Sequence, residues 1–210
     1  MLTTTLIVLF PFCRALSQKK PIVFSAIDEK PFNGYVVALN NDTIKCEFKK
    51  PTFGTLKYRP INSTGKFIKP STEKIKEYYS TLDSMVYESM FIDTISSYPT
   101  FLKRLEWGEI KLYEQDEVTQ GVFMNGYYSG GSSNSYYYVN KDNSLLREIK
   151  STTLLNNGNR KSRREYLLNL FSDDPELAEK FKNEKDFSVT TLRYYIHNYN
   201  LYKSTPAPAK

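Results

Sequence analysis

Side chains able to catalyse a reaction are few in this sequence of 210 residues. His197 is the single histidine, so a histidine-activated serine or cysteine nucleophile would have to use it. The apolar spacing around it predicts a helix, with His197 on the helix surface or at the edge of the core. Zinc sites usually take several cysteine and histidine ligands, which are too scarce here. We expect no catalytic residue of this kind, no metal and no cofactor.

Paired carboxylates are the remaining route to catalysis, because a glycosidase flanks the sugar bond with two of them. Acids cluster in YEQDE, residues 113–117, and in SDDPE, residues 172–176. The first segment reads as a solvated loop, and the second as a helix start, where the dipole favours negative charge. Asp173 and Asp174 could bind calcium, but the regular spacing of a calcium-binding loop is absent. These patterns favour a non-catalytic protein, with a carboxylate-dependent hydrolase as an alternative.

Aromatic side chains are the most abundant potential binding groups, with 17 Tyr and 13 Phe in the chain. Exposed tyrosines on a sheet suit sugar faces or protein partners, because the ring is apolar and its hydroxyl can bond. Most of the aromatic residues are expected in core and sheet packing. The candidates for a contact surface are Tyr127, Tyr128, Tyr136, Tyr137 and Tyr138.

The N-terminal segment has the pattern of a secretory leader. Residues 6–12 are apolar, and small residues in 15–17 place the expected cleavage after Ser17 or Gln18. The apolar run is much shorter than the roughly 20 residues that a membrane-spanning helix needs. A buried strand is the alternative, since no Lys or Arg precedes the run. We therefore expect residues 1–18 to be a signal peptide, and the protein to be periplasmic or extracellular without a membrane span.

Basic residues gather in one place, RKSRRE, residues 160–165. The cluster consists of Arg160, Lys161, Arg163 and Arg164. It reads either as the solvated first turn of a helix or as a patch for an anionic partner, such as a lipid headgroup or an acidic polysaccharide. The formal net charge of the whole chain is only +6. Because we expect export, nucleic acid is not an expected partner.

Residues 33–149 favour strands, because β-branched and aromatic runs alternate with turn residues. GYVVAL (34–39) and TIKCEF (43–48) predict a hairpin around a tight polar turn. Cys46, the one cysteine left after removal of the leader, is expected to be a buried hydrophobe on the second strand. Strands are also predicted for 55–59 and, centrally in the sheet, for 84–92.

Other segments predict further local elements. Residues 71–79 predict a short helical turn. Residues 101–114 predict a hairpin turning at Trp107 and Gly108, with a helical turn as the alternative for its first arm. GVFMNGYY (121–128) and SYYYVNK (135–141) predict a third hairpin with a long glycine- and serine-rich tip.

The C-terminal part changes to helical periodicity, with apolar residues at i, i+3 and i+4. Three helices are predicted, with Asp174 capping the second before Pro175 and Ser188 capping the third. Isolated helices below about 12 to 15 residues are marginal, so these must pack on the sheet or on one another. Residues 203–210 are expected to form a disordered tail.

The expected fold is α+β, a strongly curved or partly closed antiparallel sheet of about seven to nine strands with a C-terminal cluster of three short helices. Residues 19–156 would form the β-rich region and 157–202 the helical region of one domain. Curvature would explain how so many strands avoid a long exposed edge.

The sequence GYVV followed by DTI, residues 34–37 and 42–44, resembles the opening hairpin of a group of uncharacterised exported proteins of Bacteroidota-type bacteria. Similar motifs follow in that group and stand here at 101–114, 136–141, 167–177 and 199–200. Cys46 takes a position where glycine is usual in the group. The resemblance covers most of the mature chain and implies compartment and architecture, with no activity attached.

The leading functional hypothesis is an exported, non-catalytic envelope protein. It would bind another macromolecule, protein or glycan, through the tyrosine-rich hairpin or the adjacent sheet face. The first alternative is a carrier that holds a small sugar or lipid inside a half-open barrel.

Overall fold

The computed structural model describes residues 30–50, 55–92, 98–119, 121, 123–124, 127–128, 130–142, 144–152 and 160–204. The predicted signal peptide, residues 1–18, lies outside these ranges. Residues 205–210 of the predicted tail also lie outside them, whereas the last helix continues through Ser204.

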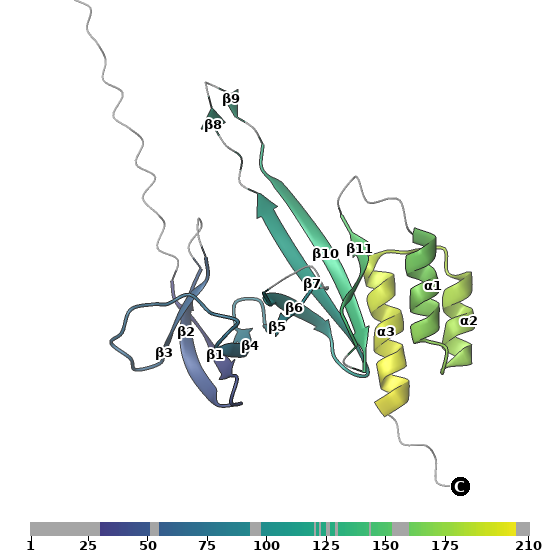
Figure 1. Ribbon diagram of the computed structural model, residues 1–210, viewed down its shortest axis with the longest axis horizontal. Helices are drawn as coiled ribbons and strands as arrows, with labels where there is room; N and C mark the ends of the chain where they lie inside the picture. Colours follow the sequence, from purple (N-terminus) through teal and green to yellow (C-terminus); the bar gives the residue numbers. More distant parts are fainter. Residues whose placement is uncertain are drawn as a thin grey trace, which may run out of the picture.

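Nine strands form one open antiparallel sheet in the spatial order β11-β10-β7-β6-β5-β4-β1-β2-β3 (Figure 1). They are β1 (Phe32–Ala38), β2 (Thr43–Lys49), β3 (Lys57–Pro60), β4 (Ile75–Ser80), β5 (Met85–Met90), β6 (Thr100–Glu106), β7 (Ile110–Thr119), β10 (Ser132–Lys141) and β11 (Arg147–Ser151). Two short strands, β8 (Phe123–Met124) and β9 (Tyr127–Tyr128), pair with each other. The helices are α1 (Arg160–Leu170), α2 (Pro175–Asn183) and α3 (Val189–Ser204). The predicted α+β fold is confirmed, and the sheet is open.

Two of the three predicted hairpins are confirmed. β1 pairs with β2, and Asn41 in the connecting turn has φ 68°, a left-handed conformation that asparagine tolerates. Gly34 in β1 is required by close packing, because a Cβ there would lie 2.0 Å from the carbonyl oxygen of Tyr79. β6 and β7 pair across the turn that holds Trp107 and Gly108. The predicted central strand is β5, the fifth of the nine in spatial order.

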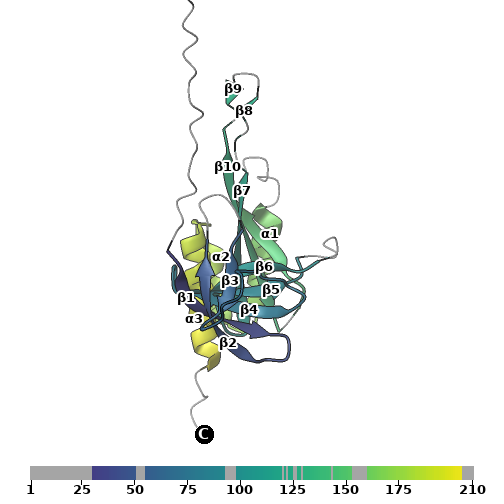
Figure 2. The ribbon, with the colours of Figure 1, turned by 90° about the vertical axis from the view of Figure 1, so that its left-hand side faces the viewer.

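Two local predictions were wrong. Residues 75–80 form strand β4, and only the single turn before it, closed by the Ile75 N–H to the Ser71 carbonyl at 2.9 Å, resembles the predicted helical turn. Pairing with β1 and β5 determines this conformation, since it buries Ile75 and Tyr78. The strand that holds residues 136–138 pairs with β7 over ten positions, whereas the described strands within 121–128, β8 and β9, pair with each other. β7 and β10 therefore extend together beyond the other strands, toward β8 and β9 (Figure 2).

The sheet twists strongly along its length, and its two ends are built differently (Figures 1 and 2). At the β1–β5 end, rings pack together in a cluster around Phe48, which touches Phe32, Tyr58 and Tyr78 with ring centroids 5.7 to 6.0 Å apart. Cys46 is fully buried in this cluster, as predicted. Burial raises the pKa of its thiol, so it is a packing residue.

The helical layer covers the other end of the sheet, over β6, β7, β10 and β11 (Figure 1). This core buries strand residues such as Leu112 and Val139 against helix residues such as Leu167, Phe181 and Ile196. Both predicted caps are present. The Leu177 N–H donates to the Asp174 carboxylate at 3.1 Å, and the Thr191 N–H donates to the Ser188 hydroxyl at 3.2 Å.

Asn200 attaches α3 to the start of β7 through two hydrogen bonds. Its amide nitrogen donates to the Ile110 carbonyl at 2.8 Å, and its amide oxygen accepts from the Ile110 N–H at 3.0 Å. The side chain thus pairs with β7 as a neighbouring backbone would. Gly108 makes room for it, because a Cβ there would lie 2.3 Å from the Asn200 side chain.

We predict that Asn200→Ala lowers the free energy of unfolding by about 2 kcal/mol, because two hydrogen bonds are lost and two backbone groups of Ile110 lose their partner. Urea unfolding followed by circular dichroism measures this. Asn169→Ala on the exposed face of α1 is the matched control and should change stability much less. Equal stability of the two variants would contradict the role of Asn200.

Candidate functional site

The predicted tyrosine surface is not formed by Tyr137 and Tyr138, which are only 8% and 6% exposed. Tyr137 points into the core beneath the helices, and its hydroxyl donates to Glu114 at 2.8 Å. Tyr138 points to the other face, where it packs with Leu102 and other apolar residues. The prediction of exposure failed for these two rings because both faces of β10 are covered at this point.

The other three predicted tyrosines, Tyr127, Tyr128 and Tyr136, do not define an exposed surface among the described side chains. Tyr136 is half-buried against the cluster that holds Tyr138. The backbones of Tyr127 and Tyr128 form β9, and their side chains lie outside the described residues.

The predicted basic cluster forms the first turn and a half of α1, and its four side chains have different roles. Arg160 donates to the carbonyl of Lys185 at 2.8 Å, which ties the start of α1 to the α2–α3 connection. Arg163 pairs with Glu148 on β11 at 2.7 Å. Lys161 is exposed to solvent.

Arg164 is a structural residue that closes the C-terminal end of α2. Its guanidinium donates to the carbonyls of Phe181 at 2.6 Å and Lys182 at 3.0 Å, and also to the carbonyl of Glu184. The last carbonyls of a helix have no partner within it and carry partial negative charge, so a cation there is stabilising. Its position in the basic cluster therefore reflects folding.

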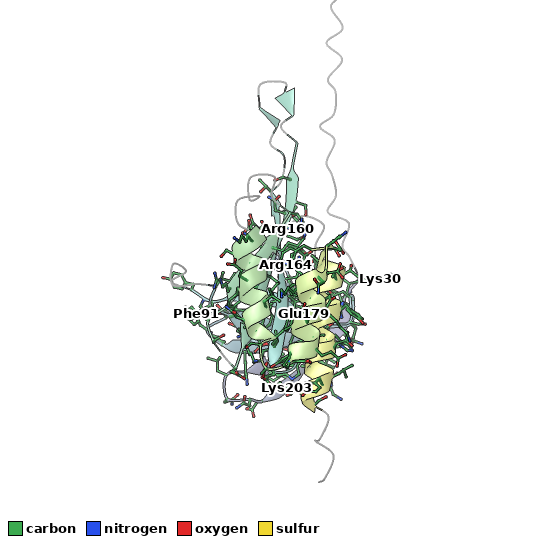
Figure 3. The ribbon with its side chains drawn as sticks, turned by 90° about the vertical axis from the view of Figure 1, so that its right-hand side faces the viewer. Lys30, Phe91, Arg160, Arg164, Glu179 and Lys203 are labelled. Atoms are coloured by element: carbon green, nitrogen blue, oxygen red, sulfur yellow. The ribbon has the colours of Figure 1, made fainter. Side chains whose placement is uncertain are left out.

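A hollow of about 530 Å³ lies where α1 and α3 begin, beside the end of β11. Its lining combines four cations, one carboxylate, two hydroxyls and one ring. These residues are Lys150, Ser151, Arg160, Arg163, Lys185, Asp186, Phe187 and Ser188. We call it the cationic hollow. Figure 3 looks onto the helical layer and shows Arg160 at the end of the layer where α1 starts.

Contacts with described residues hold three of the four cations of the hollow, Lys150, Arg160 and Arg163, in place. Lys150 donates to the Phe187 carbonyl at 2.7 Å, and Arg160 likewise donates to a carbonyl, so these two contacts neutralise no charge. Arg163 has a carboxylate partner, Glu148. A guanidinium group has five N–H donors, of which such a contact uses one.

The helix dipoles add to the positive potential of the hollow. Figure 1 shows that α1 and α3 begin at the same end of the helical layer, and the partial positive charge of a helix lies at its N-terminus. Asp186 offsets part of this field, and it is already an acceptor for the Ser188 N–H at 3.0 Å and the Ser188 hydroxyl at 2.5 Å. Hydrogen bonds from Ser188 and Thr191 lower the pKa of Asp186, so it accepts and does not donate. The arrangement as a whole suits an anionic group.

Sequence reasoning found Arg160 and Arg163 but missed Lys150 and Lys185. These two lysines alternate with acidic residues, Glu148 before Lys150 and Glu184 and Asp186 on either side of Lys185, so neither belongs to a run of bases. Only the packing of the helices on β11 brings them to the same hollow as α1.

The other residues considered for chemistry have structural partners. His197 lies on the exposed side of α3, as predicted, with its Nδ1 3.1 Å from Glu106. Glu114 pairs with Lys103 at 3.1 Å. Asp174 caps α2, and within the described residues no group of three potential metal ligands comes together.

Asp173 lies in an ionic cluster that joins the end of α1, β10 and α3. Its carboxylate contacts the ammonium groups of Lys141 and Lys203 and accepts from the buried Tyr199 hydroxyl at 2.9 Å. Partial burial disfavours its charge, but these contacts dominate and lower the pKa of Asp173 far below its ordinary value.

The carrier hypothesis expected a cavity inside a half-open barrel. The sheet is open, and a hollow of about 970 Å³ lies on the helical layer between α2 and α3, outside the sheet. Among the described residues, no helix is long and apolar enough to cross a membrane. Comparisons with protein-family models, curated proteins and solved structures gave no match. The resemblance to exported proteins therefore stays a prediction.

We predict that Arg164→Met lowers the free energy of unfolding by about 2 kcal/mol, because the terminal carbonyls of α2 lose a charged donor. Urea unfolding measures the loss, and hydrogen exchange should place it in α2. Lys161→Met, in the same turn but exposed, should leave stability nearly unchanged. An equal effect of the two substitutions would show that only total charge matters.

A second prediction concerns pH. The lowered pKa of Asp173 stabilises the fold above the unfolded value, 3.8, and this contribution is lost as the pH falls below it. Asp173→Asn should therefore be less stable than wild type at neutral pH, by about 1 kcal/mol because the group is partly exposed. The difference should shrink below about pH 4 in unfolding curves. A difference that stays constant with pH would contradict this assignment.

Proposed function

We propose that this protein is an exported, non-catalytic binding module that holds an anionic group of an envelope macromolecule in the cationic hollow. The observation that carries the proposal is the convergence of Lys150, Arg160, Arg163 and Lys185 on one hollow at the starts of two helices. Export rests on the leader-like pattern of residues 1–18.

Like charges that are gathered in one place repel one another and destabilise the folded chain. Four cations with one lining carboxylate are therefore better explained by a ligand than by stability. Lys150 and Arg160 are fixed by backbone carbonyls, so little side-chain entropy remains to be lost when an anion binds. Phosphate, sulfate or carboxylate groups match charge-assisted donors of this kind.

The lining of the hollow does not support catalysis. Its hydroxyl at Ser188 donates to Asp186, whose lowered pKa makes it a poor general acid or base. His197, which could activate a nucleophile, is not among the lining residues. Binding is thus the activity that this geometry supports best.

The direct test is titration of the full chain with inorganic phosphate, followed by backbone amide chemical shifts. Shifts are expected in 160–163 and 186–189. Arg160→Gln combined with Lys185→Gln should weaken binding about tenfold or more, because charge-assisted hydrogen bonds are each worth roughly 1.5 to 3 kcal/mol. Added sodium chloride should weaken the wild-type complex as well.

The control removes the same total charge elsewhere, with Lys45→Gln and Lys161→Gln, both at exposed positions. It should retain wild-type affinity. The proposal is wrong if phosphate shifts no amide of the hollow, or if the control weakens binding as much as the test variant does.

A further inference from the structure

The hollow between α2 and α3 has the character of a sugar-binding groove. Two of its tyrosines, Tyr194 and Tyr202, are 63% and 58% exposed, although they lie on a helix whose other face is buried. Tyr195 forms a buried wall beneath Tyr194, with the two rings edge to face at 5.5 Å. We call this hollow, of about 970 Å³, the tyrosine groove.

The two exposed tyrosines are spaced for an extended ligand. They are eight residues apart on α3, which is roughly 12 Å along the helix axis. A flat, partly apolar ring face that also carries a hydroxyl suits the faces of sugar rings. The rim adds the amide side chains of Asn183 and Asn198, whose amide nitrogens donate to Glu179 and Tyr194 of their own helices and are thereby held in place.

The charges of the groove differ from those of the cationic hollow. The lining of the groove holds four carboxylates and two lysines, and Glu176 is paired with Lys180 at 2.7 Å. Carboxylates accept hydrogen bonds from sugar hydroxyls but repel an anionic chain. The groove alone therefore favours neutral sugar units.

Lys185 lines both the tyrosine groove and the cationic hollow, so the two are adjacent. In Figure 3, Arg160 lies near the end of the helical layer where α1 starts, and Glu179 of α2 lies farther from that end. A ligand that occupies both places must be neutral over most of its length and anionic at one end. A basic peptide does not fit the hollow, and a uniformly acidic polymer or an anionic lipid surface does not fit the groove.

We infer that the tyrosine groove and the cationic hollow together bind one glycan chain, with neutral sugar units over Tyr194 and Tyr202 and an acidic substituent in the hollow. This inference rests on the proposed function, because the acidic substituent of the glycan is the anionic group proposed to bind in the cationic hollow. It adds to that function the class of ligand, a glycan, and a second set of binding residues, those of the tyrosine groove.

The test is an array of short neutral oligosaccharides and of the same chains carrying a terminal uronate or phosphate, probed with the full chain. Acid-terminated chains should bind, and their neutral counterparts should bind about tenfold more weakly. Tyr194→Ala combined with Tyr202→Ala should weaken binding about tenfold or more. Tyr98→Ala, at a tyrosine 73% exposed outside both places, is the matched control and should bind as wild type does.

Phosphate titration separates the two proposals. The double tyrosine variant should keep its affinity for inorganic phosphate, which also shows that it is folded. If the wild-type chain binds phosphate but no oligosaccharide, the glycan inference alone is overturned. If the wild-type chain binds neither phosphate nor oligosaccharide, the proposed function is overturned too. Equal binding of neutral and acidic chains overturns the inference, as does binding to vesicles with anionic lipids but not to glycans.

Discussion

Three helices of 11, 9 and 16 residues are held against one end of an open sheet, and the rest of the structure depends on this packing. The two shorter helices, α1 and α2, have little stability of their own. Burial of large side chains such as Phe181 and Ile196, each worth roughly 1.5 to 3 kcal/mol, provides most of what holds them. Hydrogen bonds then fix their position. Asn200 sets α3 against β7, and Arg164 sets the end of α2 against α1.

The same packing creates the candidate site. Because α2 runs opposite to α1 and α3, the starts of α1 and α3 lie together with the end of α2 (Figure 1). The negative end of α2 is neutralised by Arg164, so it does not cancel the positive ends of its neighbours. Lys150 on β11 and Lys185 in the α2–α3 connection then add their charges. Fold stability and the proposed anion binding thus use neighbouring residues of one basic segment in different ways.

Aromatic residues serve three purposes in this protein. Rings around Phe48 fill the cluster at the β1–β5 end of the sheet, where the three helices do not reach. Tyr137 and Tyr199 place rings in the core and satisfy their hydroxyls with carboxylates, which is the usual requirement for a buried tyrosine. Tyr194 and Tyr202 remain exposed on α3, where both line the tyrosine groove.

The sequence by itself determined the class of fold, the β1–β2 and β6–β7 hairpins, the three helices and the caps at Asp174 and Ser188, because these follow from periodicity and turn chemistry within short segments. Strand β4 and the pairing of β10 with β7 were decided by contacts between distant segments, which local patterns do not encode. The same limit applies to exposure. The sequence of a strand does not show whether other elements cover both of its faces, so the burial of Tyr137 and Tyr138 was decided by the tertiary structure. The packing of the helices on β11 likewise decided that Lys150 and Lys185 line the same hollow as Arg160.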